Sequence, residues 1–349
     1  MKIAVLKPID RPTESIISKN DFEIIDSINC LLNHPSPKKV VVFHHQTDRD
    51  PVGNIRRTID FARQAISITS AQVHILCSEM HYPEINNLLA QLDRNRIHVH
   101  LSGKLNFSLN RAKVHFWPFW LSQTAITHRH HIPDSVKDQL TPYSVKEKLF
   151  DCLLGTKRVN RDFVYNGFVS SGLADKSIMT YYGQHPNVMD DFILEPGMVP
   201  TTVVDHSMTK ANYFNETLMM SSITPISIYQ KSAYSIITET NADNTFSFFT
   251  EKTAKPMLGK RLFITFNGQY FLRNLREVGF KTFDGIIDES YDKEPNDQKR
   301  WQRALEVAIW LSRKDQSEIF KKIAPITEHN FQMINTNWNQ EINNIIQNS

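Results

Sequence analysis

The chain has 349 residues, of which 40% are hydrophobic and 22% are charged. This length exceeds what one hydrophobic core usually organises, so we expect two domains or one large α/β unit. The formal net charge of +3 is too small to indicate a polyanionic partner, and the sequence has no run of about 18 apolar residues that would span a membrane.

The chain starts with Met1-Lys2-Ile3-Ala4-Val5-Leu6. This apolar stretch is too short for a secretory signal, so we expect it to be the first strand of the fold. The three cysteines, Cys30, Cys77 and Cys152, are far apart, odd in number and without the spacing of metal ligands. Such usage is typical of a reducing cytosol, and we expect a soluble cytoplasmic protein without a zinc site.

The first third of the chain alternates short apolar runs with amphipathic stretches. Apolar residues at three- and four-residue spacing predict helices at residues 55–68 and 83–92. Short apolar runs predict strands at residues 3–6, 40–43, 73–77, 97–101 and 114–116. The β-α-β order predicts a mostly parallel, Rossmann-like sheet for residues 1–135.

The pattern breaks at residues 128–143, where Pro133 and Pro142 indicate an interdomain connection. A second Rossmann-like domain is predicted at residues 145–325, and residues 184–224 within it have weak periodicity and are expected to form an irregular excursion. Its predicted elements are strands at 148–154, 177–182, 235–238 and 262–266, and helices at 160–173, from about 250, at 271–278 and at 297–314.

Two arginines stand at the first predicted strand-to-helix turn of this second domain. The segment is Leu154-Gly155-Thr156-Lys157-Arg158-Val159-Asn160-Arg161. Backbone N–H groups at a helix N-terminus attract anions, and Arg158 and Arg161 are three residues apart on one helical face, so they could fork onto a diphosphate. The alternative is an ordinary capped and solvated helix start.

Two further segments place carboxylates and ammonium groups at the edge where ligands collect in open α/β sheets. Ile236-Ile237-Thr238-Glu239-Thr240-Asn241 delivers Glu239 and Asn241 at the end of a strand, and Glu239 suits sugar or ribose hydroxyls. Phe248-Phe249-Thr250-Glu251-Lys252-Thr253-Ala254-Lys255-Pro256 places Glu251, Lys252 and Lys255 at a helix start capped by Thr250. Carboxylates suit a ribose diol and ammonium groups suit a diphosphate, whereas helix capping or a surface salt bridge is the alternative for Glu239 and Glu251.

The order R-x-x-R, Tyr182-Gly183, Glu239-Thr240-Asn241 and Thr250-Glu251-Lys252 resembles the donor-binding domain of fucosyltransferase-type GT-B glycosyltransferases over about residues 148–290. The resemblance implies an α/β GT-B fold, with two Rossmann-like domains facing across a cleft and a helix at residues 326–349 packing back on the first domain. It also implies that Arg158 or Arg161 and Lys252 contact the donor phosphates, and that Glu239, Asn241 and Glu251 contact the ribose or sugar.

A later segment, Gly279-Phe280-Lys281-Thr282-Phe283 with Asp288-Glu289-Ser290-Tyr291-Asp292, resembles glycosyltransferase-like proteins of bacteria and large tailed phages. We therefore expect transfer of a sugar from a nucleotide sugar, as co-substrate without another cofactor, to an acceptor hydroxyl in a bacterial or phage-infected cell. The acceptor is a glycan by default. The alternatives are a phage enzyme that acts on hydroxymethylated bases of duplex DNA, and a non-catalytic module that binds nucleotides or glycans.

The expected catalytic base lies in the first domain, where Val41-Val42-Phe43-His44-His45-Gln46 is similar to the His-His-Arg-Glu segment of the same enzymes. His44, His45 and Asp48 are the candidates for deprotonating the acceptor. Asp48-Arg49-Asp50 also matches a metal-binding Asp-x-Asp pattern, but the arginines and lysines could neutralise a diphosphate, so we predict no metal. The His128-Arg129-His130-His131 cluster could indicate zinc, and we expect it to lie in solvent instead.

Overall fold

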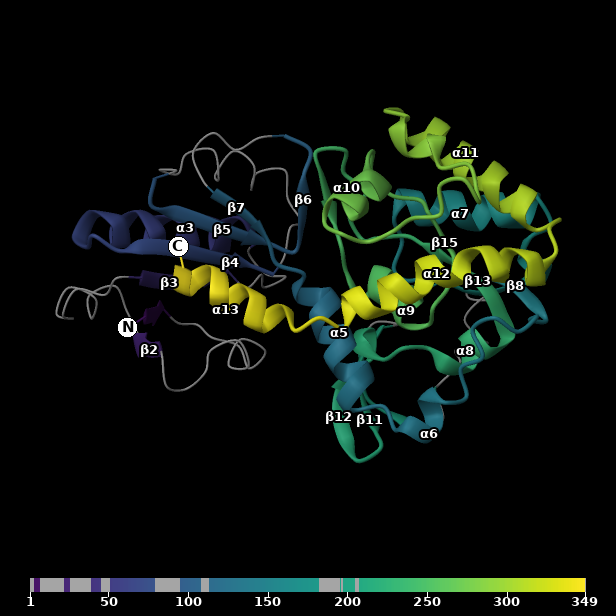
Figure 1. Cartoon of the computed structure of the whole chain (residues 1–349), viewed down its shortest axis with the longest axis horizontal. Coiled ribbons are helices and arrows are strands. Elements are labelled where there is room, and N and C mark those ends of the chain that lie inside the picture. Colours follow the sequence, from purple (N-terminus) through teal and green to yellow (C-terminus); the bar gives the residue numbers. More distant parts are fainter. Residues whose placement is uncertain are drawn as a thin grey trace. The chain divides into compact units, whose positions relative to one another are not determined.

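The chain divides into two compact units in the computed structural model (Figure 1). The structure describes residues 3–6, 22–25, 39–44, 51–78, 95–107, 113–181, 195, 197–204 and 207–348. Unit 1 comprises Met1–Ser122 and Asn337–Ser349, and unit 2 comprises Gln123–Thr336. The division falls within helix α5 (Phe119–His130), earlier than the connection predicted at residues 128–143.

Unit 1 contains a six-stranded parallel sheet of order β2-β1-β3-β4-β5-β7. Helix α3 (Pro51–Ile68) follows β3 and contacts both β3 and β4, as expected for a β-α-β unit. The predicted helix at residues 83–92 lies outside the described residues. The strands are β1 Ile3–Leu6, β2 Phe22–Ile25, β3 Lys39–His44, β4 Gln72–Cys77, β5 Ile97–Leu101 and β7 Lys113–Phe116.

The last helix, α13 (Trp338–Asn348), packs on the sheet of unit 1 (Figure 1). Its Ile342 and Ile346 are buried with Val41 and Leu76 in one hydrophobic cluster. The preceding helix, α12 (Gln316–Ile334), belongs to unit 2, so the predicted helix at 326–349 is divided between the two units.

Four histidines form a ladder on the face of the sheet that α13 covers. His74, His98, His100 and His115 lie on neighbouring strands, and the register pairs Val41 with His74 and Leu76 with His100. Nδ1 of His74 lies 3.0 Å from Nε2 of His100, and Nδ1 of His98 lies 3.0 Å from Nε2 of His115. Burial and the neighbouring histidines lower the pKa of His74 to about 2 and that of His98 to about 4.

Because these imidazoles are neutral in the folded unit but bind protons near pH 6.5 when unfolded, stability is expected to fall on acidification from pH 7 to pH 5. The loss is about 2 kcal/mol for each histidine that stays neutral. Urea unfolding followed by tryptophan fluorescence at the two pH values measures it. His74→Gln with His100→Gln should reduce the loss, and the exposed His130→Gln should not. Equal pH dependence in all three proteins would contradict this explanation.

Unit 2 is built on a four-stranded parallel sheet of order β15-β13-β8-β9. The strand order reverses at β8, because β9 lies on one side of it and β13 on the other. Both units are therefore Rossmann-like α/β structures, which confirms the fold class predicted from the sequence. The elements around the sheet are β8 Lys148–Leu154, α7 Val159–Ser170, β9 Ser177–Tyr181, α8 Ile226–Lys231, β13 Ser232–Ile237, α9 Glu251–Leu258, β15 Phe263–Thr265, α10 Phe271–Glu277 and α11 Asp297–Leu311.

The segment predicted to be an irregular excursion contains a three-stranded antiparallel sheet. Its strands are β10 (Met198–Val204), β11 (Ser207–Tyr213) and β12 (Glu216–Met219). Register shifts beside Pro200 interrupt the alternation of β10, so its sequence pattern does not predict a strand. Ala211 and Tyr213 are fully buried in its hydrophobic cluster.

A buried ion pair links Asp151 on β8 to Arg261, which precedes β15. The Arg261 guanidinium donates to Oδ2 of Asp151 at 2.6 Å, and both side chains are less than 5% exposed. Arg261 also donates to the hydroxyls of Ser232 and Ser235 at 2.9 Å and stacks on the ring of Tyr229. Every charged group of this cluster therefore has partners, as burial of charge requires.

Candidate functional site

A cavity of about 400 Å³ opens at the point where the strand order of unit 2 reverses. It lies beyond the carboxyl ends of β8, β9 and β13, which is where ligands bind in open α/β sheets. Its polar wall is lined by Gly155, Thr156, Arg161, Thr180, Glu195, Ser221, Thr240, Glu251, Lys252 and Lys255. Its apolar wall is lined by Leu153, Met198, Met220, Ile223, Pro225 and Ile228.

The turn between β8 and α7 supplies the first part of the polar wall. Arg158 is the N-cap residue of α7 and has an extended backbone, but its side chain makes no capping hydrogen bond. The N-cap side chain therefore accepts no hydrogen bond from the first amide groups of α7. These amides follow Thr156, which lines the cavity. At Gly155 an added Cβ would lie 3.2 Å from Nη1 of Arg161, so glycine allows the guanidinium to approach the turn.

Arg161 is 2% exposed and lines the cavity. Its Nη1 donates to the carbonyl of Thr156 at 2.7 Å, and its Nη2 donates to the hydroxyl of Thr240 at 3.4 Å. Its Nε has no hydrogen-bond partner among the described residues. Burial and the nearby Arg158 lower the pKa of Arg161, an effect that Glu239 and Glu251 oppose. The Arg161 side chain is thus a buried cation at the wall of a cavity.

Helix α9 supplies the second part of the polar wall. Thr250 is its N-cap, and its hydroxyl accepts from the N–H of Lys252. Nζ of Lys252 lies 2.5 Å from Oε1 of Glu251. Burial would raise the pKa of Glu251, but Lys252 and Lys255 outweigh it and the pKa is lowered. The carboxylate of Glu251 is therefore held ionised in the cavity.

Lys255 lies one turn further along α9 and also faces the cavity. It makes no hydrogen bond or ion pair with the residues that the structure describes, and burial lowers its pKa to about 8, against the opposing effect of Glu251. Arg161, Lys252 and Lys255 thus bring three cationic groups from two helices to one cavity.

Glu239 has a different position from the one expected of a ribose ligand. It is fully buried, and its carboxylate accepts from the N–H of Thr250 at 3.0 Å, from the hydroxyl of Thr253 at 2.6 Å and from the hydroxyl of Thr250. It is not among the described residues that line the cavity. Glu239 therefore fixes the start of α9. This is the capping role that the sequence allows for this residue as the alternative to a ribose contact.

Arg158 and Asn241 also lie outside the cavity lining that the described residues form. Arg158 is exposed and donates to the carbonyl of Lys157. Oδ1 of Asn241 accepts from the N–H of Asp243 at 3.1 Å and so closes a local turn. Of the pair in the R-x-x-R motif, only Arg161 reaches the site.

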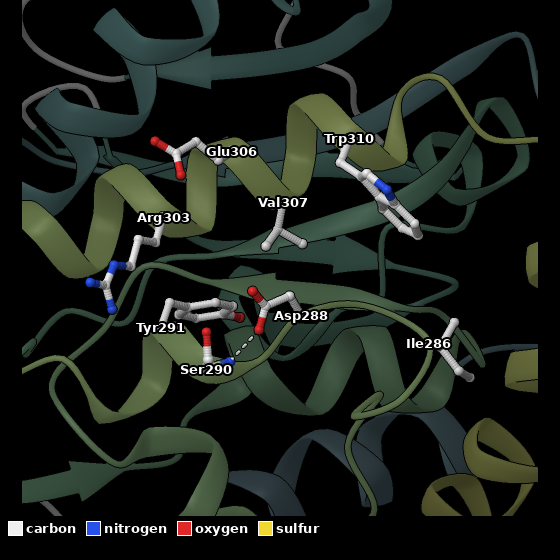
Figure 2. A pocket seen from close by; sticks show the side chains of 8 residues that line it. All are labelled: Ile286, Asp288, Ser290, Tyr291, Arg303, Glu306, Val307 and Trp310. Carbon is white, nitrogen blue, oxygen red and sulfur yellow. Dashed lines mark hydrogen bonds between the residues drawn. The ribbon is translucent and has the colours of Figure 1, made fainter.

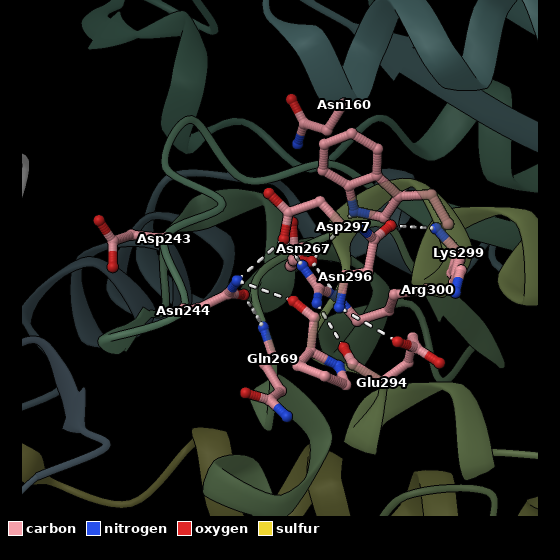
Figure 3. Close-up of polar contacts among 12 residues, drawn as sticks. Asn160, Asp243, Asn244, Asn267, Gln269, Glu294, Asn296, Asp297, Lys299 and Arg300 are labelled. Carbon is pink, nitrogen blue, oxygen red and sulfur yellow. Dashed lines mark hydrogen bonds and ion pairs between the residues drawn. The ribbon is translucent and has the colours of Figure 1, made fainter.

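A polar network around Asn267 supports the backbone at Glu239, after β13 (Figure 3). Oδ1 of Asn267 accepts from the N–H of Glu239 at 2.7 Å, and its carbonyl accepts from Nε of Arg300 at 2.9 Å. Nδ2 of Asn160, on α7, donates to the carbonyl of Glu239 at 3.2 Å and to that of Phe266 at 3.0 Å. The network therefore ties α7 to the carboxyl ends of β13 and β15.

Glu195 is a cavity residue that the sequence motifs did not identify. It is 3% exposed, and its carboxylate accepts from the hydroxyl of Ser227 at 2.8 Å and from the N–H of Ser227 at 3.2 Å. Burial raises its pKa, although Ser227 opposes the shift. It stands in the segment that the sequence predicts to be an irregular excursion, where no motif indicates a carboxylate near α9.

The predicted catalytic residues are described only in part. His44 ends β3 in unit 1, and only its backbone is described. His45 and Asp48 lie outside the described residues, as does Asp50.

The expectation that the histidine cluster near residue 130 lies in solvent is wrong for His128. Its side chain is 5% exposed and its Nδ1 lies 3.1 Å from the hydroxyl of Thr224, because α5 turns this residue inward. Burial lowers its pKa to about 4.

Among the described residues, no group of three or more His, Cys, Asp or Glu side chains is placed to hold a metal ion. Within the same residues, no helix has the length and apolar character to cross a membrane.

No protein-family model matches the chain, and no curated protein matches it significantly. Among solved structures, one described as trehalose-6-phosphate from E. coli bound with UDP-2-fluoro glucose is similar over 100% of this chain and 99% of that chain. The TM-score is 0.44 and the sequence identity is 8%. At this level the likeness carries no argument about ligand or activity.

Proposed function

We propose that the protein is a glycosyltransferase of the GT-B type that uses a nucleotide-sugar donor. The observation that carries the proposal is the convergence of Arg161, Lys252 and Lys255 on one cavity at the strand-order switch of unit 2. On this proposal the donor binds in unit 2 and the acceptor mainly on unit 1.

The polar wall suits the diphosphate of such a donor. The guanidinium of Arg161 and the first amides of α7 are donors for phosphate oxygens, and Lys252 and Lys255 add positive charge from α9. When the bond from sugar to phosphate breaks, negative charge grows on the leaving diphosphate, and fixed cations stabilise it. We therefore propose that transfer requires no divalent metal.

The remaining parts of the cavity suit the rest of the donor. The ionised Glu251 is an acceptor for hydroxyls of the ribose or sugar, and the apolar wall with Met198, Met220 and Ile223 offers a surface for a ring. The base that deprotonates the acceptor is proposed to be His44, His45 or Asp48 of unit 1.

We propose a glycan as the acceptor. The alternative acceptor, hydroxymethylated duplex DNA, would require base extrusion and binding that weakens steeply with salt. A lack of affinity for duplex DNA at low salt would exclude it. A non-catalytic module would bind its ligand without transferring a sugar.

The donor is identified by a thermal-shift screen of uridine, guanosine, cytidine and other nucleotide sugars. A ligand at about 100 times its dissociation constant stabilises the protein by roughly 2.7 kcal/mol, so a true donor is expected to raise the melting temperature clearly. The matching nucleoside without phosphates serves as the control and should have little effect. If no nucleotide or nucleotide sugar stabilises the protein, the proposed function is wrong.

A further inference from the structure

Unit 2 contains a second cavity, of about 500 Å³, between helix α11 and the loop at residues 286–291 (Figure 2). No residue is shared between the linings of this cavity and of the proposed donor cavity, as far as the described residues define them. It is lined by Ile286, Asp288, Ser290, Tyr291, Arg303, Glu306, Val307 and Trp310.

The loop side of this cavity is held in place by two buried carboxylates. Glu289 accepts from the hydroxyl of Thr282 at 2.7 Å and from the N–H of Phe283 at 2.6 Å. Asp292 accepts from two N–H groups of α10 at 2.9 Å. In the Asp288-Glu289-Ser290-Tyr291-Asp292 segment, Glu289 and Asp292 therefore have a structural role. Asp288 and Ser290 remain exposed at the cavity.

The helix side of the cavity presents Arg303, Val307 and Trp310, which lie three or four residues apart on one face of α11. The Trp310 side chain is 41% exposed, and Figure 2 shows it at one end of the cavity, with Arg303 at the other and Asp288 between them. Nζ of Lys314 lies 4.6 Å from the centre of the Trp310 ring and helps to hold it in place.

The polar side chains and the aromatic ring of this second cavity favour one class of ligand. Asp288 and Glu306 are acceptors, Arg303 is a donor and the Ser290 hydroxyl can be either, so the cavity offers both polarities beside an aromatic face. Arg303 also lies 3.4 Å from a carboxylate oxygen of Glu294, so three carboxylates outnumber the cations of Arg303 and Lys314 here, which is unfavourable for a phosphate. A sugar ring has hydroxyls at its edge and C–H groups on its face, and it matches such a surface because the face of an aromatic ring is negative.

We propose that this cavity binds a neutral saccharide, whose ring stacks on Trp310 and whose hydroxyls bond to Asp288 and Glu306. The site does not depend on the proposed function, because a sugar bound here has no contact with the residues of the donor cavity. If that function holds, the site would retain the glycan near the enzyme between transfers.

The test uses the full chain labelled with 5-fluorotryptophan, which contains five tryptophans, and fluorine NMR. The Trp310 signal is assigned as the one absent from Trp310→Phe. Titration with methyl glycosides of glucose, galactose, mannose and N-acetylglucosamine is expected to move this signal saturably for at least one of them. Asp288→Asn should weaken that binding about ten-fold, which is the loss of one charged hydrogen bond. The control is Asp284→Asn, an exposed aspartate of the same loop that does not line the cavity, and it should leave binding unchanged.

Unchanged Trp310 signals with all four glycosides up to their solubility would overturn the proposal. So would a response to arginine methyl ester but to none of the glycosides, because the cavity would then be a site for cationic groups. Equal weakening by Asp288→Asn and Asp284→Asn would also overturn it. Failure here leaves the nucleotide-sugar thermal shift unaffected, so the two proposals are tested separately.

Discussion

Arg161→Ala is expected to weaken binding of the donor identified by thermal shift by roughly 30-fold to 160-fold, which corresponds to about 2 to 3 kcal/mol. The reason is that Arg161 is buried at the cavity wall, so the bonds of its guanidinium to phosphate would form with little competition from water. Isothermal titration calorimetry with the donor measures the loss. Arg161→Lys should recover only part of the affinity, because an ammonium group keeps the charge but not the forked geometry.

The matched control is Arg158→Ala, which removes the same side chain three residues earlier. Arg158 is exposed and does not line the cavity, so its loss should change donor affinity by less than about two-fold. Similar losses for Arg158→Ala and Arg161→Ala would show that the effect is one of general charge and would contradict the assignment. If Arg161→Ala lowers the melting temperature of the free protein, Lys252→Ala provides the second test, since the Lys252 side chain is 25% exposed and its removal disturbs packing less.

Arg261→Met is expected to lower the free energy of unfolding by about 3 to 5 kcal/mol. The substitution leaves the carboxylate of Asp151 buried without its charged partner, and it removes the donors to Ser232 and Ser235. Urea unfolding followed by circular dichroism measures the loss. The double variant Asp151→Leu with Arg261→Met should recover most of the stability, because no uncompensated charge remains. A loss of less than about 1 kcal/mol in the single variant would mean that the pair is not needed.

The pH dependence of the same variant provides a further check. Burial already raises the pKa of Asp151, and Arg261 opposes this shift. Without Arg261 the pKa rises further, so the folded variant binds a proton more readily than the unfolded chain does. Its stability deficit relative to the natural protein is therefore expected to shrink as the pH falls from 7 towards 5.

The sequence predicts the two parallel sheets well, because their strands are short apolar runs separated by amphipathic helices. It also predicts that Arg161, Glu251, Lys252 and Lys255 share a site. Arg161 follows β8, whose carboxyl end lies at this edge of the parallel sheet, and the start of α9 is held at the same edge by the bond from Thr250 to Glu239 after β13. The antiparallel sheet from β10 to β12 was not predicted, because Pro200 and the register shifts beside it hide the alternation.

The role of Glu239 could not be decided from its position in the sequence. A carboxylate that follows a strand and precedes a helix suits both a ribose hydroxyl and the free amides of a helix start. Only the folded loop shows that Thr250 and Thr253 surround this carboxylate. The histidine ladder also could not be predicted from the sequence. Each histidine lies in a predicted strand, but only the register of three strands places His74, His98 and His115 on one face.

The arrangement around Asn267 has a consequence for how the two cation-bearing helices respond to a ligand. Helix α7 is tied to the peptide of Glu239 through Asn160, and α9 is tied to the carboxylate of the same residue. At Gly268 an added Cβ would lie 2.0 Å from the carbonyl oxygen of Asp243, so the neighbouring loop is in close contact with this assembly as well. Both helices are therefore preorganised, so binding an anion between them would cost the protein little conformational entropy.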